Sequence, residues 1–366
     1  MYFKNGLSKK WFEEKLELSH GNHNPLLSME GLRGVAVFLV FLVHYSSLVK
    51  PWIMGWAIHV SDFIHNLGNV GVDLFFVLSG YLIYGTVISK PTFSPFNYAK
   101  RRIQRIYPTF LFVLTLYLIL SFAFPSESKL PQGLTNSAIY IVQNALLLPG
   151  MFNITPIITV AWSLSYEVFY YFIIPVLIPL FRLKAWSPNY RIVFWCVISV
   201  LAFIIWEFEG GPIRLVMFVS GIILFELHRN KHVSIPRYGT RMLVIALAIF
   251  GLRTVIGYSF ALSLIAVYVL FLFMCLCAFN SESFLHKWLI FKPLRWLGNM
   301  SYSYYLFHGI TLKFCFLILA FASPPSMENS YLYFWLWIPL FIITLCTSFL
   351  IFVLIERPLS LTVKNR

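Results

Sequence analysis

Residues 32–49, with the sequence LRGVAVFLVFLVHYSSLV, form an apolar run that begins beside Arg33 and contains His44 near its end. These two residues are eleven positions apart, about three turns of an α-helix, so their side chains project from one face at points about 16 Å apart along the axis. An apolar run of this length predicts a membrane-spanning helix. Because ionisable side chains inside a membrane are costly and usually functional, the pair marks a candidate site.

The whole chain has the composition of an integral membrane protein. Of its 366 residues, 59% are hydrophobic, 19% are aromatic and only 11% are charged, whereas soluble domains contain about 25% charged residues. The formal net charge is +14. Most of the basic residues fall in short segments between apolar runs, so the charge indicates membrane topology and needs no nucleic-acid partner to explain it.

Apolar runs of about 17 to 25 residues predict about ten transmembrane helices and therefore an all-α polytopic fold. The expected spans are residues 32–49, 68–88, 106–124, 162–181, 191–207, 212–228, 241–257, 258–279, 299–322 and 331–355. The segment 135–150 is apolar enough to form a re-entrant or interfacial element. Short cytoplasmic segments carry the excess of Lys and Arg. With the N-terminus inside, these segments hold 23 of the 28 basic residues, so both termini are expected to be cytoplasmic.

This pattern divides the chain into a cytoplasmic tail (1–31), a single membrane domain (32–356) and a second cytoplasmic tail (357–366). The five cysteines all lie in apolar runs. They form no C-x-x-C pair and have no histidine at ligand spacing nearby. We therefore expect neither a disulfide framework nor a metal site.

Two carboxylates are expected at the depth of His44. Asp73 lies in the first turns of one predicted span and Glu167 about 7 Å along another, and both spans start on the side opposite to the termini. A carboxylate beside a histidine orients its ring and raises its basicity, as a general base requires. Two alternatives stay open: Asp73 could cap its helix, and His44 could hold neighbouring helices together. Arg33 could likewise be a snorkelling topology anchor.

A basic segment lies at the cytoplasmic mouth of the third predicted span. Its cations are Lys100, Arg101, Arg102 and Arg105. Such a strip binds lipid headgroups or another anionic ligand, and composition alone favours headgroups. Arg33 lies at the membrane boundary and His44 three turns deeper. Together with these two residues, the basic segment could also form a binding site for a long donor with a phosphate head, such as coenzyme A.

The chain resembles the bacterial membrane acyltransferase-3 family in several blocks that run in family order. The first is the signature of an arginine, ten residues and a histidine, here Arg33 and His44, which starts within residues 30–34. The others are residues 71–81 (GVDLFFVLSGY), 101–108 (RRIQRIYP), 162–167 (WSLSYE), 297–308 (LGNMSYSYYLFH) and 355–358 (IERP). The blocks extend across nearly the whole chain, so the resemblance treats residues 32–356 as one acyltransferase-3 domain.

The resemblance implies an O-acetyltransferase of the bacterial cytoplasmic (inner) membrane. Such an enzyme moves an acyl group, usually acetyl from acetyl-CoA, to a hydroxyl of a cell-surface glycan or its lipid-linked precursor, such as O-antigen of lipopolysaccharide, capsule or exopolysaccharide. The expected partners are membrane lipids, acetyl-CoA and the glycan. The oligomeric state is left open. Some relatives carry a C-terminal hydrolase-like domain, and here we expect the membrane domain to complete transfer itself.

The resemblance also implies that Arg33 and His44 are essential. The chemistry of the residues adds a mechanistic hypothesis, in which His44 is the general base, with Asp73 or Glu167 beside it. The residues expected to bind the donor phosphates are Arg33, Arg101, Arg102 and Arg105. Accessory candidates are Ser79, Tyr81, Trp162, Tyr302, Tyr305 and His308. Direct transfer and transfer through an acetyl-His44 intermediate both stay open.

The alternative class is a transporter or flippase for a lipid-linked saccharide, which would use the same polar core as a pathway without chemistry. Many transporters have a duplicated half and paired broken helices. The sequence contains no detectable sign of either, so the enzyme is preferred.

Overall fold

The computed structural model describes residues 9–18, 26–230, 238–325 and 329–361, and all regular secondary structure in these ranges is helical. This confirms the all-α fold. The helices are α1 (Lys9–Leu16), α2 (Leu27–Val49), α3 (Trp56–Gly68), α4 (Val70–Ile88), α5 (Pro95–Ala123), α6 (Leu134–Ala145), α7 (Trp162–Leu180), α8 (Pro188–Glu209), α9 (Val216–Arg229), α10 (Gly239–Ile256), α11 (Phe260–Phe279), α12 (Phe284–Leu289), α13 (Lys292–Asn299), α14 (Ser301–Ala322) and α15 (Leu332–Ile351). A π-helical segment, η6 (Phe352–Leu361), continues α15. The outer parts of the expected tails 1–31 and 357–366 lie outside the described residues.

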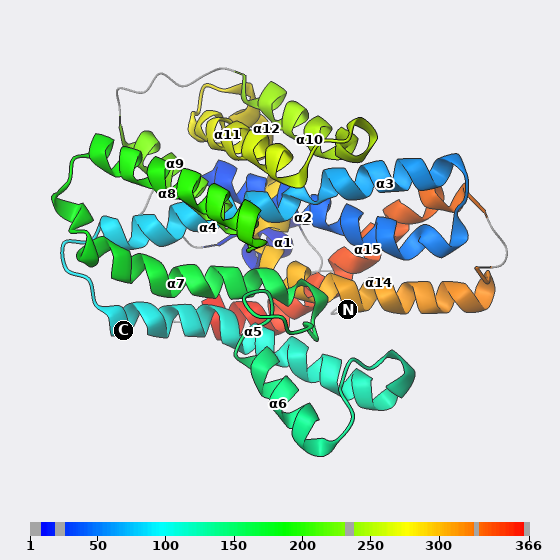
Figure 1. Cartoon of the computed structure of the whole chain (residues 1–366). Coiled ribbons are helices and arrows are strands. Elements are labelled where there is room, and N and C mark those ends of the chain that lie inside the picture. The colour runs from blue at the N-terminus through cyan, green and yellow to red at the C-terminus, as the bar shows by residue number, and fades with distance from the viewer. Residues whose placement is uncertain (1–8, 19–25, 231–237, 326–328, 362–366) are drawn as a thin grey trace.

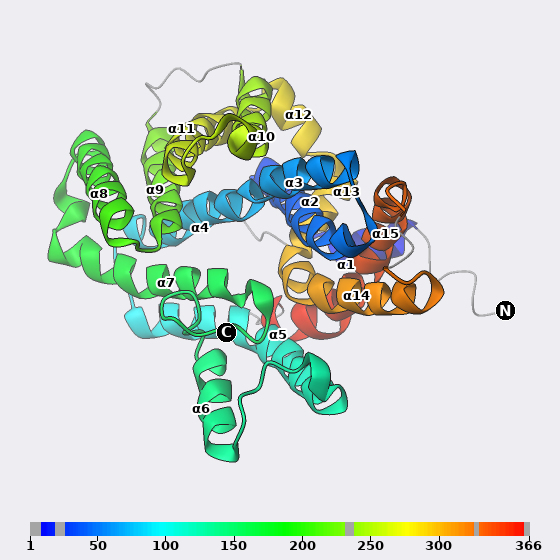
Figure 2. The same cartoon turned by 45° about the vertical axis from the view of Figure 1, so that its right-hand side comes forward.

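Nine helices in the described ranges are long and apolar enough to cross a membrane. One of them combines α3 and α4 as Trp56–Ile88, where the sequence predicts a span only from residue 68. The span expected at 212–228 is present as α9, which has only 14 residues, or about 21 Å of helix. The segment expected to be re-entrant or interfacial forms α6, 12 residues long. It projects from the bundle in both views (Figure 1, Figure 2).

The short helix α9 is enclosed by other helices, since every residue from 216 to 226 is buried. It packs directly against α4. A Cβ atom on Gly80 would lie 2.0 Å from the carbonyl oxygen of Phe218, and one on Gly221 would lie 1.9 Å from that of Val77. Only glycine fits at either position, so the two backbones touch, as small residues permit between membrane helices. This contact fixes α4, which supplies part of the site.

The beginning of α2 is fixed by similar contacts with α13. A Cβ atom on Gly34 would lie 2.2 Å from a carbonyl oxygen of α13, and one on Gly298 would lie 1.8 Å from that of Glu30. Arg295 of α13 also pairs with Glu30, with 2.8 Å between Nε and Oε2. Gly34, next to Arg33, and Gly298 of α13 therefore serve packing, and they hold Arg33 at a fixed height in the bundle.

Basic loops gather at one end of the bundle. Lys184 Nζ donates a hydrogen bond to the carbonyl oxygen of Lys90 at 2.6 Å, and Arg229 Nη1 donates to Ser89 Oγ at 3.2 Å. The end of α9 and the connections α4–α5 and α7–α8 therefore meet there. This grouping agrees with the charge pattern of the sequence. That this end faces the cytoplasm stays a prediction.

Candidate active site

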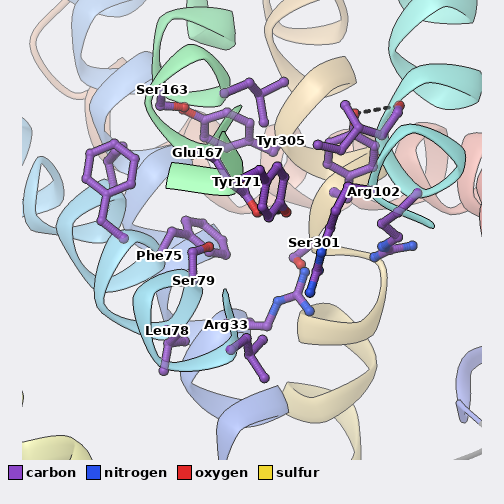
Figure 3. A pocket seen from close by; sticks show the side chains of 17 residues that line it. Arg33, Phe75, Leu78, Ser79, Arg102, Ser163, Glu167, Tyr171, Ser301 and Tyr305 are labelled. Atoms are coloured by element: carbon purple, nitrogen blue, oxygen red, sulfur yellow. Dashed lines mark hydrogen bonds between the residues drawn. The ribbon is translucent and has the colours of Figure 1, made fainter. Parts of the chain in front are cut away.

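A cavity between α2, α4, α5, α7 and α14 collects polar side chains from helices that are far apart in the sequence (Figure 3). It offers about 150 Å³ to water-sized molecules. Its polar lining residues are Arg33, Ser79, Arg102, Arg105, Ser163, Glu167, Tyr171, Ser301, Tyr302 and Tyr305. Many of the residues singled out from the sequence therefore share one site.

Three arginines line the cavity, and they differ in how far their charge is neutralised. Arg105 Nη1 lies 2.8 Å from Oε1 of Glu356, whose side chain is fully buried. Arg102 has no carboxylate at ion-pair distance in the described ranges, and its guanidinium lies 4.9 Å from the ring centroid of Tyr171. Arg33 forms neither a hydrogen bond nor an ion pair with any described residue. Two of the three cations can therefore bind an added anion.

Glu167 is the acidic side chain in the cavity lining. Its Oε1 accepts a hydrogen bond from the hydroxyl of Tyr171, one turn further along α7. Figure 3 shows both side chains and Arg102 around the same space. Arg33 and Arg102 lie within range of the charge on Glu167. This carboxylate partly offsets the positive field of the arginines, and the cavity as a whole stays cationic.

Helix α14 begins at the cavity. Its first residue, Ser301, is 1% exposed, and its Oγ has no hydrogen-bond partner among the described residues. The first backbone N–H groups of a helix lack intrahelical acceptors and carry partial positive charge. Glu356 accepts one of them, from Ser303 N at 3.0 Å. The remaining donors and the Ser301 hydroxyl add to the capacity of the cavity to hold an anion.

His44 lies beside the cavity and is not part of its lining. Its ring contacts the ring of His308 edge-on, with 4.9 Å between centroids. Two further ring contacts lead back to the cavity: His308 lies 6.3 Å from Tyr305, and Tyr305 lies 6.0 Å from Phe75. Tyr305 and Phe75 both line the cavity. The histidine pair therefore adjoins one end of the cavity, about 16 Å along α2 from Arg33.

The carboxylates expected beside His44 have other partners. Asp73 is fully buried, its Oδ1 lies 3.2 Å from Nη1 of Arg214, and its Oδ2 has no hydrogen-bond partner in the described ranges. Glu167 binds Tyr171. Depth along a helix can be read from sequence, but each residue is turned by about 100° from the last, and neighbouring helices decide which faces meet. The structure does not support a carboxylate as the group that orients His44.

Besides His44, Asp73 and His308, three more expected site residues are not part of the cavity lining. Arg101 is exposed, because it is turned by about 100° around α5 from its neighbour Arg102. The hydroxyl of Tyr81 is hydrogen-bonded to Nδ1 of His228 at 2.7 Å. Trp162 packs against other aromatic rings. The position of Arg101 does not support the expected contact with donor phosphates inside the cavity.

Two of the accessory candidates, Tyr302 and Tyr305, hold helices together. Tyr305 shares a hydrogen bond of 2.6 Å with Oγ of Ser163. The hydroxyl of Tyr302 donates to the carbonyl oxygen of Ile106 at 2.8 Å. Ser79, by contrast, lines the cavity without a hydrogen bond to any described residue. Of these three, Ser79 alone has a hydroxyl that can bind a ligand without breaking a described contact.

Sequence reasoning assigned no site role to Glu356, Ser301 or Tyr171. Glu356 precedes Arg357 in the chain, yet its ion pair is with Arg105. A carboxylate at the end of an apolar run was a usable signal. Ser301 and Tyr171 gave none, because serine and tyrosine are common packing residues in membrane helices.

The side chains of the cavity are suited to anions and not to metal ions. Guanidinium groups donate hydrogen bonds and accept none. In the described ranges, no group of three or more His, Cys, Asp or Glu side chains could hold a metal ion. The five cysteines are all free.

The chain matches the acyltransferase-3 family, described as an acyltransferase domain, over residues 26–355. The O-acetyltransferase OatA of Staphylococcus aureus (strain NCTC 8325 / PS 47) is 26% identical over 321 residues, which cover 77% of this chain and 50% of that protein. The peptidoglycan O-acetyltransferase OatA of Listeria monocytogenes is 26% identical over 332 residues, which cover 81% of this chain and 51% of that protein. The chain therefore spans about half the length of the curated relatives it matches. No solved structure matches it.

The family match begins just before α2 and ends inside η6, so it includes every helix that lines the cavity. The sequence blocks that carry the resemblance supply Arg33, Arg102, Glu167 and Tyr305 to that cavity. This multi-pass membrane chain belongs to the acyltransferase-3 family.

Proposed function

We propose that the chain transfers an acetyl group from acetyl-CoA to a hydroxyl of a cell-surface glycan. One observation carries this proposal. A single cavity contains Arg33 and Arg102, which form no ion pair with any described residue, and one end of the same cavity adjoins His44 and His308. Family membership supports acyl transfer, and both relatives described above are O-acetyltransferases by name.

The chemistry of the cavity supports an anionic donor. Arginine binds phosphate through charge-assisted hydrogen bonds, and Ser301 with the first turn of α14 adds neutral donors at the same place. The cavity volume of about 150 Å³ is below the roughly 300–1,000 Å³ of pockets that enclose a drug-sized ligand. We infer that only part of acetyl-CoA enters, and that the remainder lies over the basic loops outside.

His44 is the proposed general base. It takes the proton of the acceptor hydroxyl while the hydroxyl oxygen forms a C–O bond to the acetyl carbon. The C–S bond of the thioester breaks, and the leaving thiolate takes up the proton from His44. This direct route needs no protein nucleophile, which distinguishes it from a route through acetyl-His44.

The proposed acceptor is a glycan at the surface of the bacterial inner membrane. The name of the Listeria relative points to peptidoglycan. The sequence blocks are equally consistent with a lipid-linked unit of O-antigen, capsule or exopolysaccharide. All of these present sugar hydroxyls to a membrane protein, so the same chemistry applies to each.

Mass spectrometry of surface glycans tests the proposal in cells that express the protein. Wild type, His44→Ala and His59→Ala are compared at matched protein levels. His59 is an exposed histidine on α3 and serves as the matched control. We expect an acetyl mass increment in wild type and His59→Ala that disappears in His44→Ala.

Two results would overturn the proposal. Unchanged acetylation in His44→Ala would show that His44 is not the general base. Loss of glycan export with no change in acetylation would favour the transporter or flippase. Release of free CoA thiol from acetyl-CoA by purified protein, supplied with the glycan found in this way, then tests the donor.

A further inference from the structure

His308 is a buried histidine whose surroundings are more specific than packing requires. It lies on α14, is 0% exposed, and stacks on the ring of Tyr304 with 5.2 Å between centroids and 8° between planes. Its ring is in edge-type contact with the ring of His44 of α2. Figure 2 shows these two helices next to each other in the bundle.

The hydrogen bonding of His308 fixes which nitrogen carries its proton. Nδ1 lies 2.8 Å from the carbonyl oxygen of Tyr304. A carbonyl oxygen can only accept, so Nδ1 is the protonated donor and, in the neutral ring, Nε2 carries the lone pair. Nε2 is buried and has no hydrogen-bond partner among the described residues. A buried polar atom without a partner is costly and calls for an explanation.

His44 needs a partner of the kind that His308 offers. A histidine that acts as a base receives a proton on one ring nitrogen, and an acceptor facing its other N–H orients the ring and stabilises the imidazolium that forms. Asp73 and Glu167 are bound elsewhere. The centroid distance of 4.9 Å places the two imidazole rings in direct contact, and no hydrogen bond between them is formed in the structure as described.

We propose that His308 is the positioning residue of the active site: its Nε2 lone pair accepts the N–H of His44 when substrate is bound, so that the other nitrogen of His44 faces the acceptor hydroxyl. This inference rests on the proposed function, in which His44 is the base. Hydrogen bonds of this kind are often long in a free enzyme and tighten in the complex. A neutral histidine thus takes the place that a carboxylate was expected to fill.

The residues around His44 and His308 favour a positioning role for His308. His308 does not line the cavity, so a donor held there would meet Tyr305 before it meets His308. Tyr304 stacks on the ring of His308, and the hydroxyl of Tyr304 is shared with Thr344 at 2.9 Å. Nε2 is therefore the ring nitrogen of His308 that is left for a new partner, and His44 is the imidazole in ring contact with His308.

Three substitutions of His308 distinguish a role in positioning His44 from a role in packing alone. In His308→Gln, the amide oxygen lies close to the position of Nε2 and keeps the acceptor. In His308→Asn, the shorter side chain reaches only the position of Nδ1, and the acceptor is lost. His308→Phe keeps the ring and its stacking on Tyr304 but has no acceptor. The rates are measured in membrane vesicles that contain the endogenous glycan and are supplied with acetyl-CoA.

We expect His308→Gln to retain most of kcat. His308→Asn and His308→Phe should lower kcat by about 10- to 100-fold, the range found when a partner that orients a metal-binding histidine is removed. KM for acetyl-CoA should stay unchanged in all three, because the donor is bound by other residues. Equal rates for Gln and Phe, or a loss that appears in KM alone, would overturn the proposal. Inactive wild-type vesicles would instead count against the proposed function itself.

A spectroscopic measurement tests the same contact without turnover. Solid-state NMR of protein labelled with ¹⁵N-histidine reports the protonation of each ring nitrogen, and His44→Ala and His308→Phe assign the two rings. We expect a protonated Nδ1 and an unprotonated Nε2 on His308, and we expect the His44 signals to shift in His308→Phe. A protonated Nε2, or His44 signals that do not respond, would refute the assignment even if every variant were inactive.

Discussion

Replacing Glu356 with alanine should destabilise the protein more than removing an exposed ion pair. The Glu356 side chain is 0% exposed and accepts three hydrogen bonds, from Arg105 Nη1 at 2.8 Å, Ser303 N at 3.0 Å and Ser303 Oγ at 2.5 Å. Removing one partner of a buried ion pair costs about 3–5 kcal/mol, because the other charge is left uncompensated. The Arg105 side chain is 25% exposed, so water can reach it and we expect the lower end, about 3 kcal/mol.

Two controls separate the loss of charge from the loss of volume. Glu356→Gln keeps an acceptor oxygen for Ser303 and nearly the same shape, so its cost should fall between wild type and alanine. Asp62→Ala removes an ion pair with Lys50 whose side chains are 43% and 47% exposed. Exposed pairs contribute about 0–1 kcal/mol, so this variant should remain close to wild type.

The free energy of unfolding is measured by titration with SDS in mixed micelles, with the same lipid and detergent for every variant. Adding Arg105→Met to Glu356→Ala should restore part of the lost stability, because Arg105 is then no longer a charge that has lost its carboxylate partner. The reasoning is refuted if Glu356→Ala and Asp62→Ala lower the free energy of unfolding equally, or if the double variant is the least stable of all.

Three further predictions concern the cavity and its supports. Arg102→Gln should raise the Kd for CoA by about 10- to 100-fold, the effect of losing one charge-assisted hydrogen bond. Arg101→Gln should change this Kd by less than about fivefold. Both values are measured by calorimetry with CoA, and equal effects would show that the cavity does not bind the donor. Ser301→Ala should raise the same Kd by about 2- to 10-fold through loss of a neutral donor, and an unchanged Kd would mean that the start of α14 does not contact the donor. Gly298→Ala should lower the melting temperature, because its Cβ would lie 1.8 Å from the carbonyl oxygen of Glu30; a stable Gly298→Ala variant would show that α2 and α13 can separate.

The sequence was sufficient to predict an all-α fold and the relative positions of residues on one helix. Hydropathy alone identified most spans, because each needs about twenty apolar residues whatever its neighbours are. The helical repeat correctly put Arg33 and His44 on one helix, three turns apart. The helix expected at 212–228 is present as α9 but is shorter than predicted, with 14 residues. Because other helices and not lipid surround α9, its length is not set by the thickness of the membrane.

The partners of polar side chains were less predictable. Glu356 and Arg105 are 251 positions apart in the chain, and nothing in either local sequence indicates the other. Asp73 was placed at the depth of His44, but its partner is Arg214, which precedes the short helix α9. Such pairings depend on the rotation of each helix about its axis, and that rotation is set by contacts such as Gly80 with α9.

The sequence by itself determined that this protein is a helical membrane protein of the acyltransferase-3 type, with a histidine three turns from an arginine on one helix. Hydropathy and the helical repeat are local properties, so they can be read along the chain. The tertiary structure alone decided that Arg33, Arg102 and Ser301 face one cavity, that Arg101 does not, and that His44 lies against His308. These contacts join helices that are far apart in the chain, and only close packing of their surfaces selects which faces meet.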